Sequence, residues 1–116
     1  MTAYYLMNFR SANNADLRQS FALTDSASTP VNLTGSSLKM HIEVSSNGST
    51  LEASTGNGRI AVVNATAGQF DIAVPAVLMH TLPEGIHQHD LLLTLPSGQV
   101  HRIWAGTLTL ARGVTT

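Results

Sequence analysis

The segment from Gly85 to Leu110 constrains the fold most, because in it two long runs of strand-forming residues meet at one clear turn. In the first run, apolar and polar residues alternate, and side chains of an extended strand point alternately to opposite faces. The more apolar of its two faces consists of His87, His89, Leu91, Leu93 and Leu95. Pro96-Ser97-Gly98 then supplies turn chemistry, since Pro presets φ and Gly tolerates a positive φ. We therefore expect a β-hairpin.

The returning run, from Val100 to Leu110, is rich in β-branched and aromatic residues, which favours a strand. Trp104, Leu108 and Leu110 share one parity in it. Gly106 interrupts the run, and a glycine inside a strand indicates a bulge or a close approach of another backbone segment. Both alternatives stay open from the sequence.

The rest of the chain predicts further short strands separated by turn residues. The expected strands cover residues 16–24, 38–44, a short segment around Leu51, 59–64 and 69–74. Pro75 ends the last of these, because it cannot donate to a strand ladder, and a short helical turn is expected near residues 75–82. About seven strands with frequent turns are typical of an antiparallel all-β sandwich or barrel. We predict one such domain over residues 1–116.

The N-terminal run Tyr4-Tyr5-Leu6-Met7-Asn8-Phe9 is β-prone and is followed by a polar loop. Residues 1–13 are therefore interpreted as an edge strand or an arm that only a partner orders. The hypothesis is that Tyr4 to Phe9 adds as a strand to the sheet edge of a neighbouring subunit. Its predicted interface residues are Tyr4, Tyr5, Leu6, Phe9 and Trp104.

Composition excludes several classes of function. Without cysteine the chain has neither disulfides nor thiolate metal ligands. The six Lys and Arg residues are scattered and the net charge is −1, so a phosphate-binding surface for nucleic acid is not expected. No basic leader and no run of about 18 apolar residues is present, so we expect an uncleaved chain, made in the cytoplasm, with no membrane segment. Only 11% of residues are charged, which favours a surface that is buried in an assembly.

His87-x-His89 followed by Asp90 is the one pattern with metal-ligand spacing, because residues two apart on a strand point the same way. A third ligand would have to come from His41, His80 or His101, and the sequence does not place any of them nearby. Strand histidines of this kind also serve as packing residues. We therefore predict no resident metal or cofactor and keep His87 and His89 as the candidate ligands.

The sequence contains neither a G-x-S-x-G elbow nor two acids on one face of an expected strand, so we predict a protein that is not an enzyme. An alternative function is sugar or receptor binding, with Trp104, Tyr4 and Tyr5 as an aromatic platform. A lone Trp in a small sandwich also fits a core position or an interface anchor.

A series of short motifs, in a fixed order over residues 16 to 116, resembles small phage and prophage tail proteins, and is similar to the N-terminal sandwich domain of siphophage upper baseplate proteins. The motifs are Asn32-Leu33-Thr34-Gly35, Asn57-Gly58-Arg59-Ile60, Gly68-Gln69-Phe70, the Pro75 to Leu82 segment, Gly85-x-His87-x-His89-Asp90-Leu91, Ser97-Gly98-Gln99-Val100, Gly106-x-Leu108-x-Leu110 and Gly113-Val114-Thr115. The family usually has Tyr-x-Tyr-Asp where this chain has His87-Gln88-His89-Asp90. Histidine is planar and hydrogen-bonds, so it can fill an aromatic position in the packing.

The resemblance implies an immunoglobulin-like sandwich and a non-enzymatic component of a virion. Such a protein would dock on a tail, baseplate or neck ring, with copies of itself and other virion proteins as its partners.

Overall fold

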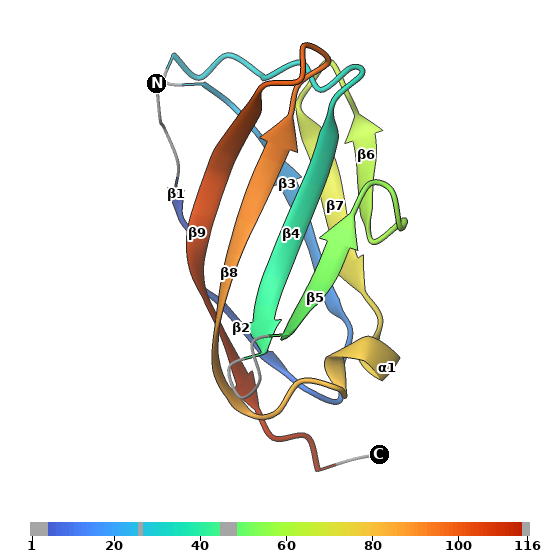
Figure 1. Ribbon diagram of the computed structural model, residues 1–116, viewed down its shortest axis with the longest axis vertical. Helices are drawn as coiled ribbons and strands as arrows, with labels where there is room; N and C mark the ends of the chain where they lie inside the picture. Colours follow the sequence, from blue (N-terminus) through green and yellow to red (C-terminus); the bar gives the residue numbers. More distant parts are fainter. Residues whose placement is uncertain (1–4, 26, 45–48, 115–116) are drawn as a thin grey trace.

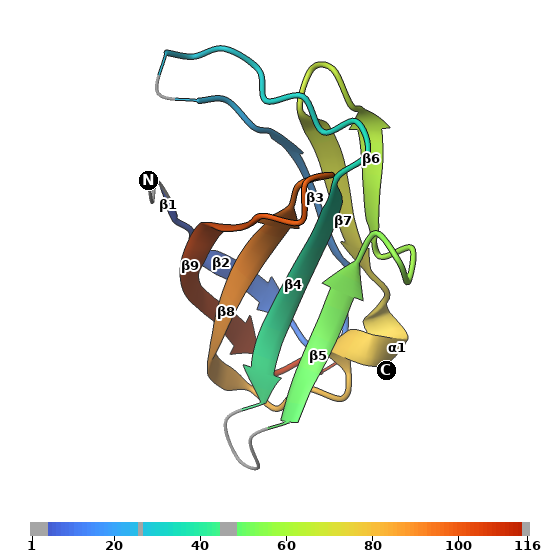
Figure 2. The same cartoon turned by 45° about the horizontal axis from the view of Figure 1, so that its top comes forward.

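The computed structural model describes residues 5–25, 27–44 and 49–114, which form two facing β-sheets and one short helix (Figure 1). The larger sheet has six strands, in the order β1-β9-β8-β4-β5, with β2 also paired to β9. Its strands are β1 (Tyr5–Leu6), β2 (Phe9–Ala12), β4 (Ser37–Val44), β5 (Ser49–Ser54), β8 (Gly85–Thr94) and β9 (Val100–Ala111). The smaller sheet has the order β3-β7-β6 and consists of β3 (Leu17–Ala22), β6 (Ile60–Asn64) and β7 (Gln69–Val74). Figure 2 shows these three strands as a layer behind β9, β8, β4 and β5.

The predicted all-β sandwich is confirmed, with seven strands, β3 to β9, that pair antiparallel with one another. In immunoglobulin lettering, β3, β7 and β6 occupy the B, E and D positions, while β9, β8, β4 and β5 occupy G, F, C and C′. The sheet order is therefore that of an immunoglobulin-like sandwich.

The short helix α1 (Ala76–Met79) lies in the connection from β7 to β8, as the sequence predicts. Pro75, with φ near −67°, precedes it and cannot extend the β7 ladder. The backbone N–H of Ala76 donates to the Asp16 carboxylate at 2.7 Å, which ties the start of the helix to the end of the β2–β3 connection. Met79 is fully buried and anchors the helix to the core.

The hairpin of β8 and β9 is the longest pairing in the structure, and it closes through the predicted turn. Leu95 and Gln99 bracket that turn with a 2.8 Å backbone hydrogen bond, and Gly98 has φ of 92°. A register shift between Leu91 and Leu92 leaves Ile103 as an extra residue on β9, which is a β-bulge. The bulge allows both Ile103 and Trp104 to be buried.

Of the two interpretations of the N-terminal run, the edge strand is correct for the described residues 5–13 and the arm is wrong. Strands β1 and β2 run parallel to β9 and pair with it over Tyr5↔Trp104 and Phe9↔Leu108, so the prediction of a segment ordered only by a partner is wrong for residues 5–13. This pairing also qualifies the antiparallel prediction, since this edge of the larger sheet is parallel. Gly106 makes the pairing possible, because its missing side chain leaves room for the Met7 carbonyl. Of the two alternatives for Gly106, the close backbone approach is correct, and the bulge lies instead at Ile103.

The core lies between the two sheets and is centred on an aromatic cluster. Trp104 is 2% exposed and packs against Phe9, Phe21 and Phe70, with ring centroids 4.7 to 6.2 Å apart. Aliphatic side chains from both sheets extend the core along the strands; they include Leu38, Met40, Ile42, Ile72, Val74, Leu91, Leu93, Leu108 and Leu110. Burying such side chains contributes about 1.5–3 kcal/mol each, so these alternating strand positions are the main source of stability.

Candidate functional site

His87 and His89 point to the same side of β8, as the sequence predicts, but that side faces the core. They are 1% and 5% exposed, respectively. The other candidate ligands lie elsewhere: His41 is on β4, His101 is on β9, and His80 follows α1 with its Nδ1 against the Asn13 carbonyl at 3.2 Å. Among the described residues, no three His, Cys, Asp or Glu side chains come together as a metal site.

His87 joins three segments of the chain through its two ring nitrogens. Its Nε2 lies 2.8 Å from the Pro83 carbonyl, and its Nδ1 lies 3.0 Å from the Glu43 carbonyl at the end of β4. Carbonyl oxygens only accept, so the neutral ring donates to one of them and the protonated ring donates to both. The hydrogen bond to the upstream Pro83 resembles a tyrosine corner, in which a Tyr at the start of strand F bonds the backbone a few residues back. The sequence predicts a planar, hydrogen-bonding side chain at this position, and the contacts of the His87 ring with Pro83 and Glu43 agree with that prediction.

His89 packs in the aromatic cluster, with its ring centroid 5.0 Å from that of Phe9. Its Nε2 lies 3.2 Å from the Thr107 carbonyl, which fixes the N–H on that nitrogen in the neutral ring. Burial lowers the pKa of His89, while the Thr107 and Met7 carbonyls and the Asp90 charge act in the opposite direction. The ring is therefore kept neutral by its surroundings.

The predicted interface residues do not form one surface. Phe9 and Trp104 lie in the core of their own chain, so the prediction that they anchor a partner is wrong. The backbone of Tyr5 and Leu6 pairs with β9, and Tyr4 lies outside the described residues. Because Trp104 is buried, it also offers no platform for a sugar.

The side of the larger sheet that points away from the core, which we call the outer face, is a continuous solvent-facing surface with functional groups. It is formed by the outward side chains of four adjacent strands, β5, β4, β8 and β9. These side chains are Thr50, Glu52, Lys39, His41, Glu43, Gln88, Asp90, Leu92, Arg102, Ala105 and Thr107. Two shallow hollows lie on it, of about 250 Å³ and 670 Å³.

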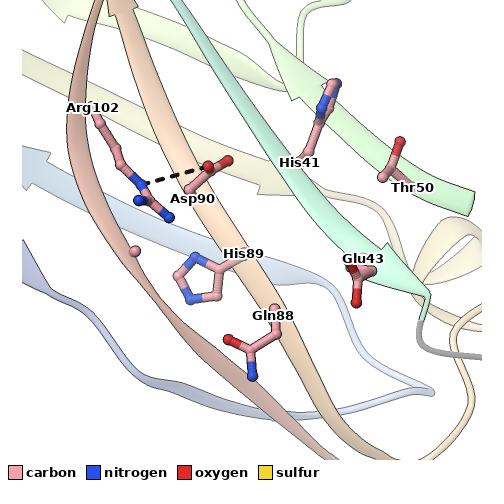
Figure 3. Close-up of a pocket in the computed structure, with 8 residues that line it drawn as sticks. His41, Glu43, Thr50, Gln88, His89, Asp90 and Arg102 are labelled. Carbon is pink, nitrogen blue, oxygen red and sulfur yellow. Dashed lines mark ion pairs between the residues drawn. The ribbon is translucent and has the colours of Figure 1, made fainter. Parts of the chain in front are cut away.

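Four residues cross the outer face as a charge row, one from each strand: Glu52 on β5, His41 on β4, Asp90 on β8 and Arg102 on β9. Strand register places three of them, since His41 is opposite both Glu52 and Asp90. Arg102 is opposite Leu92, and its side chain reaches along the sheet to pair with Asp90. Figure 3 shows Arg102 and Asp90 joined by their ion pair, with His41 beyond Asp90 on the next strand.

Both ends of the charge row are held by contacts within the chain. The His41 Nε2 lies 3.0 Å from Glu52 Oε1, and the Arg102 Nε lies 3.6 Å from Asp90 Oδ2. Arg59 Nη1 donates to the Glu52 backbone carbonyl at 2.7 Å and Ser54 Oγ donates to its carboxylate at 3.3 Å. The hydrogen bond from His41 is the main cause that lowers the pKa of Glu52, despite partial desolvation.

The charge row is ordered but accessible. Its four side chains are between 37% and 49% exposed, so solvent screens the pairs within the chain and their contribution to stability is small. The same side chains remain able to contact another molecule. Sequence reasoning missed the row, although each residue lies at an outward position of an expected strand, because alternation does not reveal which strands are neighbours.

A scan against protein-family models and a search of curated proteins both found no match. In the described residues, no helix has the length and apolar character that crossing a membrane requires.

Proposed function

We propose that this protein is a non-enzymatic structural component of a phage or prophage virion, in the tail, baseplate or neck, and that it acts through protein–protein contacts. The motif order over residues 16 to 116 supports the virion assignment by resemblance, and the immunoglobulin-like sandwich is the fold that the resemblance implies. Its partners are copies of itself and other virion proteins, and it is made in the cytoplasm of the host bacterium.

The observation that carries the contact function is the outer face. It presents four strands of ordered polar and charged side chains to solvent, with shallow hollows. Flat surfaces of this kind suit protein contact, whereas small-molecule sites are usually concave and largely apolar. The low content of charged residues, 11%, leaves the rest of the surface easy to bury against neighbours.

The alternative, a sugar- or receptor-binding module, rested on Trp104 as part of an aromatic platform. Trp104 is 2% exposed and surrounded by Phe9, Phe21 and Phe70. That observation now favours a core role, and we do not propose sugar binding.

The experiment that tests the virion assignment is proteomic. Particles released by the strain that encodes this chain are purified on a density gradient and digested for mass spectrometry. We expect peptides of this chain in fixed ratio to the major tail proteins, and particles from a strain that lacks the gene should show an incomplete tail in electron micrographs. Absence of the chain from infectious particles would overturn the proposal.

A further inference from the structure

The charge row has an order that is complementary to itself. From β5 to β9 it reads carboxylate, imidazole, carboxylate, guanidinium, in Glu52, His41, Asp90 and Arg102. The four strands are direct neighbours, about 4.8 Å apart. Glu52, His41 and Asp90 are in register across β5, β4 and β8, and the Arg102 side chain reaches along the sheet to bring its Nε within 3.6 Å of the Asp90 carboxylate. Reversing the row places Glu52 against Arg102 and His41 against Asp90.

We propose that a second copy of this chain docks on the outer face, related by a two-fold axis that runs parallel to the strands between β4 and β8. This inference rests on the proposed role in assembly and names the partner and its surface. A two-fold contact uses the same surface on both copies, so every contact occurs twice. The axis exchanges β5 with β9 and β4 with β8. Glu52 of each copy then faces Arg102 of the other, and His41, when protonated, faces Asp90 of the other.

The charges select this axis over the other two-fold arrangement of stacked sheets. An axis in the same plane but along the charge row, perpendicular to the strands, would place each strand over its own copy. Glu52 would then face Glu52, Asp90 would face Asp90 and Arg102 would face Arg102. Juxtaposed like charges are strongly unfavourable at an interface, so the charge row excludes that arrangement.

The residues beside the charge row also form complementary contacts when the two-fold axis places β4 of one copy over β8 of the other. Glu43 on β4 and Gln88 on β8 line one hollow, and the axis brings the Glu43 carboxylate of one copy to the Gln88 amide of the other, which can donate to it. Lys39 on β4 is paired in register with Leu92 on β8. The exchange sets the aliphatic part of the Lys39 side chain over Leu92 of the second copy.

The size of the face indicates a weak dimer. The eight residues of β4 extend about 26 Å, and four strands are about 19 Å wide, so the projected area is on the order of 500 Å². Standard interfaces bury about 800 Å² on each partner. We therefore expect association that depends on protein concentration and weakens with added salt.

Sedimentation equilibrium of the full chain tests the proposal. The wild type should dimerise, and Arg102→Glu and Glu52→Arg should each raise the dimer dissociation constant on the order of tenfold to a hundredfold, because each creates two like-charge contacts. An equimolar mixture of the two variants should form a heterodimer. Position 52 of each chain then faces position 102 of the other, so that a glutamate meets an arginine at both contacts. Arg102→Gln removes the ion pair with Asp90 without adding a negative charge, and it should weaken the dimer less than Arg102→Glu.

Arg18→Glu is the matched control. It makes the same change in net charge as Arg102→Glu, on an exposed residue of β3 in the smaller sheet. It should leave the dimer as strong as in the wild type. Its heterodimer with Glu52→Arg should be weaker than the one that Arg102→Glu forms, because one of the two contacts would join two arginines. Melting curves establish that each variant is folded before its association is measured.

Three results would overturn the inference: a wild type that stays monomeric up to about 1 mM, reversal variants that dimerise as the wild type does, or a mixture that fails to form the heterodimer. The dimer and the virion role can be rejected independently of each other. A monomeric chain found in particles rejects only this inference, whereas a dimer that is absent from particles rejects only the virion role.

Discussion

The backbone of Gly106 on β9 lies directly against the carbonyl of Met7, and a methyl group at position 106 would overlap that carbonyl. Two hydrogen bonds flank the contact. The Met7 N–H donates to the Ala105 carbonyl at 3.0 Å, and the Thr107 N–H donates to Asn8 Oδ1 at 3.1 Å. This approach lets the N-terminal segment complete the edge of the larger sheet and brings Phe9 into the core.

Gly106→Ala should therefore destabilise the protein by about 1–3 kcal/mol, as other overpacking substitutions do. Urea unfolding followed by circular dichroism measures the change. Gly56→Ala is the control, because an added Cβ there would meet only Ser54 Oγ at 3.6 Å, and its effect should stay within about 0.5 kcal/mol. Equal stability of the two variants would contradict the close approach.

Deletion of residues 1–12 should lower the melting temperature strongly, because it removes the strands that pair with β9 and leaves the site of Phe9 empty. Loss of a buried Phe side chain alone costs about 3–5 kcal/mol. Removal of a free arm that only a partner orders would, in contrast, leave the melting temperature unchanged. A synthetic peptide of residues 1–13, added in trans, should restore part of the lost stability. An unchanged melting temperature would reject the parallel pairing.

His87→Ala should destabilise the protein by about 1–3 kcal/mol, since it removes a buried ring and leaves the Pro83 and Glu43 carbonyls without their hydrogen-bond partner. Gln88→Ala, at the adjacent exposed position of β8, should change the unfolding free energy by less than about 0.5 kcal/mol. Chemical denaturation of both variants provides the comparison. If His87→Ala were as stable as the wild type, the histidine would not hold this corner.

The lowered pKa of His89 makes stability depend on pH. Burial favours the neutral ring in the folded state, so below the ordinary value of 6.5 the unfolded chain binds more protons than the folded one. Stability is therefore full above pH 6.5 and falls as the pH drops below it, by at most about 1.4 kcal/mol per pH unit until the lowered pKa is reached.

The variant His89→Phe keeps an aromatic ring beside Phe9. In it, the loss of stability below pH 6.5 that comes from His89 should be absent. Urea unfolding at about pH 5.5, 6.5 and 7.5, on both sides of the ordinary histidine pKa, compares the slopes of the variant and the wild type. Parallel slopes would show that His89 does not contribute to the pH dependence.

Trp104 should emit at short wavelength and resist quenching by iodide, because it is buried in the aromatic cluster. Trp104→Ala should cost about 3–5 kcal/mol. Neither monosaccharides nor glycans should change the emission spectrum. Efficient iodide quenching, or a spectral shift with sugar, would place Trp104 at the surface and revive the sugar-binding alternative.

Particular residues explain how far sequence reasoning reaches. Alternation along residues 38–44 and 87–95 predicts both strands and their buried sides, since period 2 is a property of each strand alone. Gly98 and Pro75 likewise act locally, and the turn and the helix form where they indicate. The metal hypothesis correctly placed His87 and His89 on the same side of one strand. The pattern of a single strand does not show what packs against that side, and in the fold it is backbone carbonyls and not further metal ligands.

The sequence by itself determined the strands, the turns, the short helix and the all-β class, because these depend on residues close together in the chain. Only the tertiary structure decided that Phe9 pairs beside Leu108, that His87 meets the Glu43 carbonyl and that Glu52, His41, Asp90 and Arg102 form one row. Those relationships depend on which strands become neighbours and in what register. Pairing between strands that are distant in the sequence depends on how the whole core packs. A local sequence pattern carries no information about that packing.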